Sequence, residues 1–250
     1  AQSIRLKGVL PPGGSFSGQG VNSAAGIFTP SSAGTGLKTI TYSYSNVYAC
    51  MSSMTRTILV KPAPSFICGS TFTDPRDNKA YPTVQIGTQC WMSSNLEFGF
   101  AIDDFTPQTD NCVAEKYIQN SVFYQWDELM RYTNDEGTQG FCPPGWHIPS
   151  SAEWAVLLAF YSGPGQAGGP MKDILLGNGF DSYQQGFFYL NNYRAFETGL
   201  YAGSMYWTST ASGSGRAIAR GLNEFNPSVS EYSSSRGNAF SVRCIRDVGN

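Results

Sequence analysis

The stretch Cys142-Pro-Pro-Gly-Trp-His-Ile-Pro-Ser-Ser-Ala-Glu-Trp154 carries the clearest structural signal in this chain. Ser150 and Glu153 have the spacing of a capping box, in which the two side chains satisfy free amide groups at the start of a helix. After the box, apolar residues recur at i, i+3, i+4 and i+7, which places them on one face of a helix. These residues are Trp154, Leu157, Leu158 and Tyr161. The stretch therefore predicts a cysteine just before a capped helix, which ends at Gly163-Pro-Gly165.

A second helix is predicted upstream, from Val122 to Tyr132. Phe123, Trp126 and Met130 recur there at helical spacing, and the charged residues lie off that face. Downstream of the capped helix the chain is rich in Gly, Ser and Tyr, and its clearest strand runs from Ala239 to Ile245. Four tryptophans lie in or beside regular elements, and we expect a buried position for each, with the indole N–H satisfied locally. They are Trp91, Trp126, Trp146 and Trp154.

Residues 1–60 indicate an all-β unit. The segment from Lys38 to Ser45 alternates strictly, and the run from Thr55 to Val60 is also β-prone. Gly- and Ser-rich turns separate the strands, which suggests a small sandwich. Lys61-Pro-Ala-Pro-Ser65 predicts a stiff linker, because two prolines fix the backbone and remove two amide donors. We therefore expect two domains, over residues 1–62 and 66–250.

Cysteine usage points to disulfides. The chain has six cysteines, none in a Cys-x-x-Cys pair, and one histidine, so zinc-site spacing is absent. An even number of scattered cysteines indicates an oxidising compartment, and buried free thiols are the alternative. The segment from Thr71 to Tyr81 predicts a hairpin with its turn near Asp77-Asn78, which places residue 68 opposite residue 90. Cys68–Cys90 is thus a predicted bridge, with Cys90–Cys112 as the alternative.

Composition and charge exclude some classes of partner. The formal net charge is −2 and only 14% of residues are charged, so no broad electrostatic attraction to nucleic acid or anionic membrane is expected. No run of about 18 or more apolar residues exists, so we expect no membrane insertion. Aromatic residues reach 14% and glycines number 28, a composition that suits β-rich extracellular proteins. We expect a secreted or cell-surface protein.

Separated motifs in the second unit resemble a known family. Over most of residues 66–248 the chain is closely similar to the Fibrobacter succinogenes major paralogous domain, and the landmarks occur in the right order. These landmarks are Tyr81-Pro-Thr-Val-Gln-Ile-Gly-Thr-Gln-Cys-Trp-Met92, Asn95-Leu96, Phe123-Tyr-Gln-Trp126, Cys142-Pro-Pro-Gly-Trp-His-Ile-Pro149, Glu153-Trp154, Tyr206-Trp-Thr-Ser-Thr210 and Ser241-Val-Arg-Cys-Ile-Arg-Asp247.

This resemblance implies an α+β fold of the C-type-lectin-like kind, with two helices flanking twisted sheets and the terminal strands brought together. Formylglycine-generating enzymes and the variable proteins of diversity-generating retroelements share that fold. Family members occur on secreted and surface proteins of Bacteroidetes and Fibrobacter. A Cys142–Cys244 bridge agrees with this fold, because it pins the last strand into the sheet. Closing about 100 residues is worth roughly 4–5 kcal/mol in the chain-entropy model.

The first unit resembles the immunoglobulin-like repeats of large Bacteroidetes surface adhesins. In such repeats a cysteine near the first strand faces the cysteine at position 50, and no cysteine precedes Cys50 here. We therefore expect an immunoglobulin-like sandwich cut at its start, with further domains upstream. The stretches that carry the resemblance are Gly13-Gly-Ser-Phe-Ser-Gly-Gln-Gly-Val21, Gly26-Ile-Phe-Thr-Pro30, Ala33-Gly34, Ile40-Thr-Tyr42 and Ile58-Leu-Val60.

Lectin-like folds present ligands on loops between the late strands, which correspond to residues 207–238. This segment is dense in Ser, Asn, Tyr, Arg and Gly, the composition of adaptable binding loops, although ordinary solvated hairpins are equally polar. The candidate ligand-binding residues are Trp207, Arg216, Arg220, Asn223, Glu224, Asn226, Glu231, Tyr232 and Arg236.

The functional prediction is an adhesin-like module that recognises a glycan or a surface protein of a host or neighbouring cell. The alternative is a structural tip or cap of a surface filament or phage fibre, including a diversified receptor-binding protein. An enzyme is not expected, because His147 lies in an apolar run and no cysteine pair matches the formylglycine-generating relatives. Asp103-Asp104, Asp74 and Asp77 offer oxygen ligands for calcium. The Glu-Pro-Asn and Gln-Pro-Asp motifs of sugar-binding lectins are absent, so no metal or cofactor is predicted.

Overall fold

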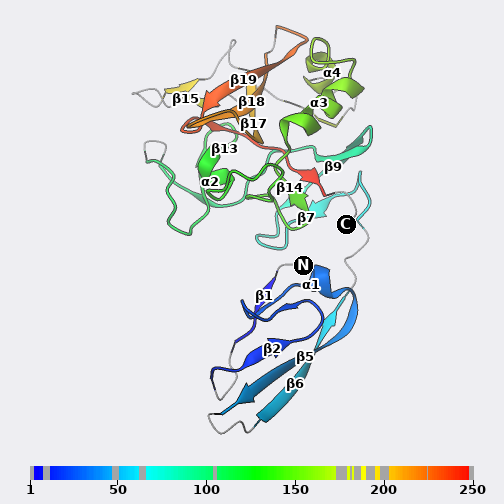
Figure 1. The fold of residues 1–250 in the computed structure, drawn as a ribbon. Helices are drawn as coiled ribbons and strands as arrows, with labels where there is room; N and C mark the ends of the chain where they lie inside the picture. The colour runs from blue at the N-terminus through cyan, green and yellow to red at the C-terminus, as the bar shows by residue number, and fades with distance from the viewer. Residues whose placement is uncertain are drawn as a thin grey trace. The chain divides into compact units, whose positions relative to one another are not determined.

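The computed structural model of the chain divides into two compact units, residues 1–65 and residues 66–250. The structure describes residues 3–7, 12–46, 51–61, 66–103, 106–172, 179–180, 182, 187–189, 195–197, 203–223 and 225–247 (Figure 1).

The described part of the first unit contains two three-stranded antiparallel sheets and one short helix, α1 (Pro30–Ala33). Side chains from both sheets, among them Phe28 and Ile40, meet in one small core. The first sheet has the order β1 (Ile4–Arg5), β4 (Ile27–Phe28) and β3 (Val21–Asn22). The second has the order β2 (Ser15–Ser17), β5 (Gly36–Ser45) and β6 (Met51–Val60).

The two strands predicted in this unit are confirmed and are longer than expected. β5 and β6 pair without interruption from Gly36 opposite Val60 to Ser45 opposite Met51. Ile40 and Tyr42 are buried, as the alternation of the sequence requires. β6 is an edge strand of this sheet, and the first seven of its ten residues are exposed.

The predicted α+β fold of the C-type-lectin-like kind with two helices is wrong as a fold class. Strands hold 40% of the described residues and helices hold 11%, distributed over several small sheets and four short helices. Apart from the predicted capped helix, each helix of the described part is only four or five residues long. The second unit is therefore a mostly β structure in which one helix of ten residues packs on the sheets.

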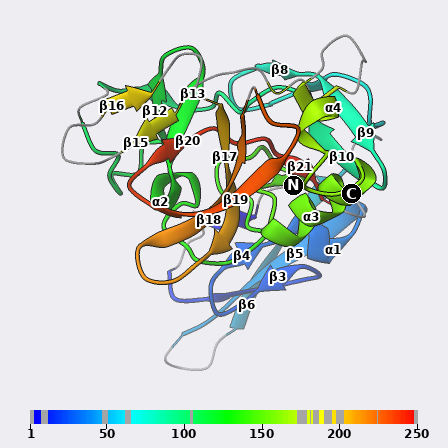
Figure 2. The same cartoon turned by 90° about the horizontal axis from the view of Figure 1, so that it is seen from above.

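The described strands of the second unit form four sheets (Figures 1 and 2). The largest has the order β11 (Phe100–Ala101), β12 (Glu115–Ile118), β13 (Val122–Gln125), β20 (Ala239–Phe240), β15 (Phe187–Tyr189) and β16 (Ala195–Glu197). A four-stranded sheet has the order β14 (Trp146–His147), β21 (Ile245–Arg246), β10 (Gln89–Met92) and β9 (Thr83–Ile86). The other two are β17 (Ser204–Ala211), β18 (Arg216–Leu222) and β19 (Val229–Ser235), and the hairpin of β7 (Phe72–Thr73) and β8 (Ala80–Tyr81).

The capped helix is present as α3 (Ser151–Phe160). The Ser150 hydroxyl accepts a hydrogen bond from the Glu153 amide at 3.2 Å, and the Glu153 carboxylate accepts one from the Ser150 amide at 2.8 Å. Trp154, Leu157 and Leu158 are buried, so the predicted apolar face does reach the core. Figure 2 shows α3 beside the β17–β18–β19 sheet.

The helix predicted from Val122 to Tyr132 is wrong over its first turn. Residues Val122–Gln125 form strand β13, and only Trp126–Leu129 form a helix, α2. Val122, Phe123 and Tyr124 are all buried, so both faces of β13 are covered, and its two edges pair with β12 and β20. A short apolar run of this kind fits a fully buried strand as well as a helix, so periodicity alone misassigned it.

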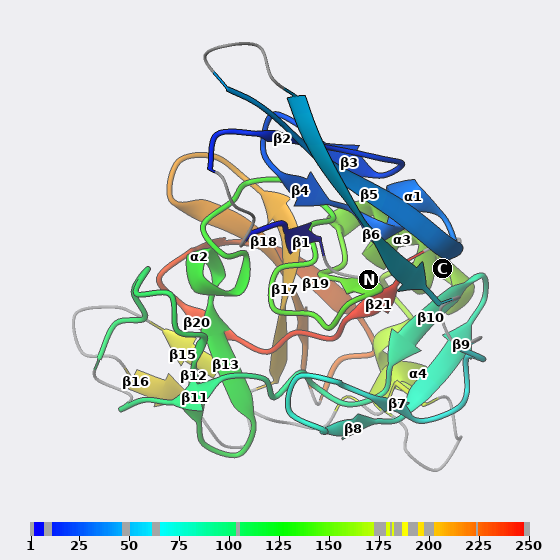
Figure 3. The same ribbon diagram turned by 90° about the horizontal axis from the view of Figure 1, so that it is seen from below.

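The predicted strand from Ala239 to Ile245 is correct only in part, because this segment passes from one sheet to another. β20 pairs with β13, Ser241 bridges Tyr206, and β21 pairs with both β10 and β14. Figure 3 shows this red segment running between the two sheets. The segment thus joins the two largest sheets of the unit and brings the C-terminal residues against the element that precedes α3.

The tryptophans predicted to be core residues, Trp91, Trp126, Trp146 and Trp154, each have 0% exposure. They lie in two clusters, one around Trp91 and Trp154 and one around Trp126 and Trp146. The indole N–H of Trp91 donates to the Gln89 side chain at 3.2 Å, and that of Trp126 donates to the Thr208 carbonyl at 2.8 Å. The indole nitrogens of Trp146 and Trp154 are buried without a hydrogen-bond partner in the described part of the chain, so the expectation of a local partner is wrong for these two. No helix in the described ranges is long and apolar enough to span a bilayer.

Candidate ligand-binding site

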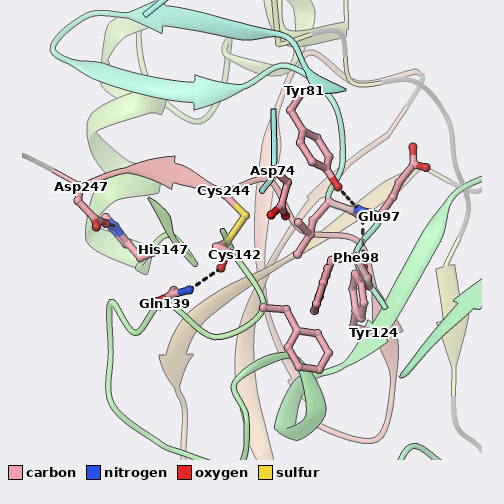
Figure 4. The surroundings of a disulfide bond; sticks show 12 residues. Asp74, Tyr81, Glu97, Phe98, Tyr124, Gln139, Cys142, His147, Cys244 and Asp247 are labelled. Atoms are coloured by element: carbon pink, nitrogen blue, oxygen red, sulfur yellow. Dashed lines mark hydrogen bonds and ion pairs between the residues drawn. A yellow bond between two sulfur atoms is a disulfide. The ribbon is translucent and has the colours of Figure 1, made fainter. Parts of the chain in front are cut away.

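Two disulfides hold the second unit together, and both match the predicted pairs. Cys142 is bonded to Cys244 across a separation of 102 residues, and Cys68 is bonded to Cys90 across 22 residues. Figure 4 shows the Cys142–Cys244 bond with His147 and Asp247 on one side and Phe98 and Tyr124 on the other. Cys112 is a free, exposed thiol, so the alternative Cys90–Cys112 pairing is wrong. Cys50 lies outside the described residues.

The predicted binding residue Trp207 is a core residue. Its side chain has 0% exposure, its indole N–H donates to the Tyr124 carbonyl at 2.9 Å, and its ring packs on Phe240 with the centroids 4.3 Å apart. A side chain with no exposed area does not contact a ligand at the surface. Trp207 begins a polar stretch in the sequence, but its side chain lies on the core face of β17.

Arg220 is also buried, with 7% exposure, and it links three elements. Its guanidinium lies 2.5 Å from the Glu231 carboxylate on β19 and donates to the Ser151 hydroxyl at the start of α3 at 2.7 Å. Burial lowers the pKa of Arg220, and the charge of Glu231 raises it in part. Arg220 and Glu231 thus attach α3 to the sheet, a structural task for two residues that were predicted to bind a ligand.

Most of the other predicted residues form hydrogen bonds within the domain. Arg236 donates to Asp127 at 3.1 Å and lies over the Trp126 ring, 4.0 Å from its centroid. Arg216 is exposed and bonds to Ser233 across the hairpin. The side chains of Asn223 and Asn226 accept hydrogen bonds from the amides two residues further on, which closes tight turns. Glu224 lies outside the described residues.

The predicted set does not form one surface. Arg220 pairs with Glu231 and Ala219 pairs with Tyr232 in an uninterrupted register, so Tyr232 lies on the opposite face of the sheet from Glu231. Side chains alternate between the faces of a strand, so Arg216 lies on the Glu231 face and Tyr232 points the other way. A single ligand does not contact both faces of the sheet at once.

A pocket of about 750 Å³ lies elsewhere on the second unit, at the C-terminal end of α2. Five separate segments line it: the β7–β8 turn, the segment that enters β11, the loop before β12, the end of α2, and residues 140–141. Its lining combines aromatic rings with charged side chains. These charged and aromatic residues include Arg76, Phe98, Phe100, Asp110, Glu128, Arg131 and Tyr132.

The backbone of this pocket is strained. Among the described residues five non-glycine residues have positive φ, and three of them, Cys112 (66°), Arg131 (55°) and Tyr132 (58°), line the pocket. Left-handed backbone costs an L-residue roughly 1–2 kcal/mol relative to the right-handed form. Strain that persists in this way is commonly found at functional sites. The clustering therefore singles out this pocket rather than the predicted loops.

The end of α2 explains two of the strained residues. The Tyr132 amide donates to the Asp127 carbonyl at 2.8 Å and the Arg131 amide donates to the Glu128 carbonyl at 3.0 Å. These two bonds form a Schellman motif, in which Arg131 occupies the left-handed position that usually holds glycine. The chain keeps two large side chains, one cationic and one aromatic, where a glycine fits with less strain.

Glu128 forms a buried wall of the pocket, with 3% exposure. Its carboxylate accepts a hydrogen bond from the Glu115 amide at 3.0 Å. Burial raises the pKa of Glu128, and hydrogen bonds from the Glu115 amide and the Tyr132 hydroxyl offset part of this rise. Glu115 in turn accepts from the Thr109 amide at 3.0 Å and from the Asn111 side chain at 2.7 Å, which fixes the loop that carries Asp110.

Arg76 fixes the aromatic side of the pocket. Its guanidinium is paired with the fully buried Asp74 at 2.6 Å and donates to the Phe141 carbonyl at 2.8 Å. The same group lies over Phe98, 3.7 Å from the ring centroid. Arg76 therefore holds Phe98 in place while its own charge is already compensated by Asp74.

The acids that offered oxygen ligands for calcium have other surroundings in the structure. Asp74 is bound to Arg76, Asp77 lines the pocket, and Asp104 lies outside the described residues. In the part of the chain that the structure describes, no three His, Cys, Asp or Glu side chains gather as a metal-binding group. The sequence offered no signal for the pocket itself, because its lining comes from residues 76 to 141 in five short pieces.

The fold and the site define a disulfide-stapled, mostly β domain with a surface pocket. The sequence model of the Fibrobacter succinogenes major domain family matches residues 84–246, and the chain belongs to this family. Comparison with curated proteins and with solved structures found no match.

Proposed function

We propose that this chain is a secreted or surface-exposed binding module, adhesin-like in its role, that recognises a glycan or a protein on a host or neighbouring cell. The observation that carries the proposal is the pocket at the end of α2. Its volume of about 750 Å³ lies within the range of small-molecule binding sites. Ligand sites of this size combine aromatic walls with a few convergent polar groups, as this pocket does.

Exposed aromatic rings at the pocket support recognition of a partner. Phe100 is 71% exposed and Tyr132 is 42% exposed, although both residues line the pocket. Large apolar side chains gathered at one hollow of the surface mark a binding site more often than the same side chains scattered singly. The left-handed backbone at Arg131 and Tyr132 carries these two side chains to the pocket at a cost in stability.

An extracellular location belongs to the proposal. Both disulfides are of the kind that persists in oxidising compartments, outside the cell or at its surface. The contacts of His147 argue against a catalytic role for this residue. Both of its ring nitrogens are hydrogen-bonded to carboxylates, Asp247 and Glu153, so neither is available as a general base.

A structural role in a filament or fibre is the second candidate, and the edge strand β6 favours it. Seven consecutive residues of β6 are exposed, and its only charged side chain is Arg56. Leu37 on β5 and Leu59 on β6 pair across the strands and are 71% and 57% exposed. Long edge strands with few charges add further strands readily, which is how a module joins an assembly.

Binding of the full chain to a glycan array and to intact bacterial and host cells tests the proposed function. The informative variant is Phe100→Ala, which removes an exposed ring of the pocket. Its matched control is Phe160→Ala, which removes a ring that is 58% exposed on α3. We expect at least one surface or array component to bind the chain, and Phe100→Ala alone to weaken that binding. Absence of binding, or equal binding by both variants, contradicts the proposal and favours the structural role.

A further inference from the structure

The pocket at the end of α2 carries nearly balanced charge. Its described lining holds two guanidinium groups, on Arg76 and Arg131, and three carboxyl groups, on Asp77, Asp110 and Glu128. Arg76 is already neutralised by Asp74. Burial raises the pKa of Glu128, which favours its neutral form. A ligand with a strong charge of either sign therefore gains little from this pocket and loses its own hydration.

The polar groups of the pocket call for a ligand that both donates and accepts hydrogen bonds. Carboxylates such as Asp110 only accept, and the guanidinium of Arg131 only donates. Both residues are exposed and neither is held in an ion pair recorded in the described structure. A hydroxyl group is a donor and an acceptor at once, so a compound with many hydroxyl groups satisfies both kinds of partner.

The aromatic residues require that the same ligand also has apolar surface. Phe98, Phe100, Phe141 and Tyr132 line the pocket, and Phe98 is held in position by the guanidinium beneath it. Aromatic faces carry a partial negative charge and attract C–H groups that are polarised by neighbouring oxygens. The ring of a sugar presents hydroxyl groups around its edge and C–H groups on its faces, so it meets both requirements.

Building on the proposed function, we infer that the pocket at the end of α2 binds a neutral carbohydrate. Asp110 accepts hydrogen bonds from sugar hydroxyls, Arg131 donates to sugar oxygens, and Phe100 and Tyr132 stack on the ring. A lysine or arginine side chain of a peptide is the competing occupant, because carboxylates and aromatic rings also attract cations. Arg131 disfavours it, since its exposed guanidinium repels a second cation in the same pocket, whereas Arg76 is already neutralised by Asp74.

Direct binding of three kinds of probe to the full chain tests this inference. The probes are neutral oligosaccharides of glucose, galactose, mannose and N-acetylglucosamine, acidic glycans that carry sialic acid or sulfate, and lysine- and arginine-rich peptides. Titration calorimetry of the unmodified chain, Phe100→Ala, Asp110→Asn and the Phe160→Ala control gives the affinities. We expect binding of at least one neutral oligosaccharide, weakened about tenfold by Phe100→Ala and about fivefold by Asp110→Asn. The Phe160→Ala control keeps the affinity of the unmodified chain.

The outcomes separate the inference from the proposed function. If an acidic glycan or a cationic peptide binds and Phe100→Ala abolishes that binding, the pocket is a binding site but its ligand class is wrong. If neutral oligosaccharides fail to bind at millimolar concentrations, the inference is overturned as well. If every bound probe is unaffected by Phe100→Ala, the pocket is not the site, and the proposed function loses the observation that carries it.

Discussion

The Nδ1 atom of His147 lies 2.7 Å from Oδ1 of Asp247, a residue 100 positions further along the chain. The other ring nitrogen, Nε2, lies 2.8 Å from Oε1 of Glu153, which also forms the capping box of α3. Burial lowers the pKa of His147, but hydrogen bonds to Asp247 and Glu153 outweigh it and raise the pKa to about 9. One imidazolium therefore ties the C-terminal strand to the start of α3, beside the Cys142–Cys244 bond (Figure 4).

Stability is predicted to fall in alkaline solution because of His147. Its pKa is about 9 in the folded chain and near 6.5 when unfolded, so the folded state binds the proton more tightly. The resulting stability is fully present below pH 6.5 and is lost as the pH rises through 9. We expect a loss on the order of 2–3 kcal/mol, measured by urea unfolding between pH 6 and 10. The His147→Gln variant is the control, and an equally steep decline in that variant contradicts the assignment.

The two disulfides are predicted to differ in their contribution to stability. The Cys142–Cys244 bond closes a loop with a separation of 102 residues and the Cys68–Cys90 bond a loop of 22. Loop-closure entropy assigns about 4–5 kcal/mol to the first and about 3 kcal/mol to the second. Replacing each pair by alanine and measuring urea unfolding without reductant tests this order. A larger loss for the Cys68–Cys90 pair shows that packing around the sulfurs, not loop length, controls the effect.

Local signals in the sequence were reliable where a few neighbouring residues determine the structure. Ser150 and Glu153 specify the start of α3 because both capping bonds form within one turn. Asn78 in the β7–β8 turn adopts a φ of 61°, which asparagine tolerates. The helix cap and this turn depend little on the rest of the fold, so the sequence alone predicts them. The Cys68–Cys90 pair was predicted correctly, but it depends on two hairpins, because β7–β8 pairs Phe72 with Tyr81 and β9–β10 pairs Gln85 with Cys90.

Features that depend on distant partners were missed. Residues 122–125 form a strand that pairs along one edge with β20, more than one hundred positions later in the chain. Arg220 and Trp207 lie in a polar stretch that predicted surface positions. In the fold, Arg220 contacts Ser151 and Trp207 packs on Phe240, and both partners come from distant parts of the chain. The pocket is assembled from five segments. Its residues Arg131 and Tyr132 have positive φ, and neither residue type predicts a left-handed backbone.

The ion pair of Arg220 and Glu231 is predicted to matter more than a surface pair. Glu231→Ala leaves a guanidinium of 7% exposure without its partner charge, and removing one partner of a buried pair is costly. Glu231 is itself half-exposed and water partly screens the pair, so we expect a loss of about 1–2 kcal/mol in urea unfolding. Glu97→Ala is the matched control, because its pair with Lys79 is exposed on both sides. That control is expected to change stability by less than about 0.5 kcal/mol. Equal effects of the two variants contradict a structural role for Arg220.

Arg131→Gly is predicted to stabilise the chain while weakening ligand binding. Arg131 has a φ of 55° at the position of the Schellman motif that favours glycine, so glycine relieves the strain. The greater freedom of glycine in the unfolded chain offsets part of this gain, which leaves about 0.5–1 kcal/mol in urea unfolding. Arg131→Ala is the matched control, since it removes the same charge and keeps the strain. We expect both variants to weaken binding of the pocket's ligand and only the glycine variant to gain stability. Equal stability of the two variants means that the backbone at Arg131 stores no strain, and the pocket then loses one of the features that distinguish it from the rest of the surface.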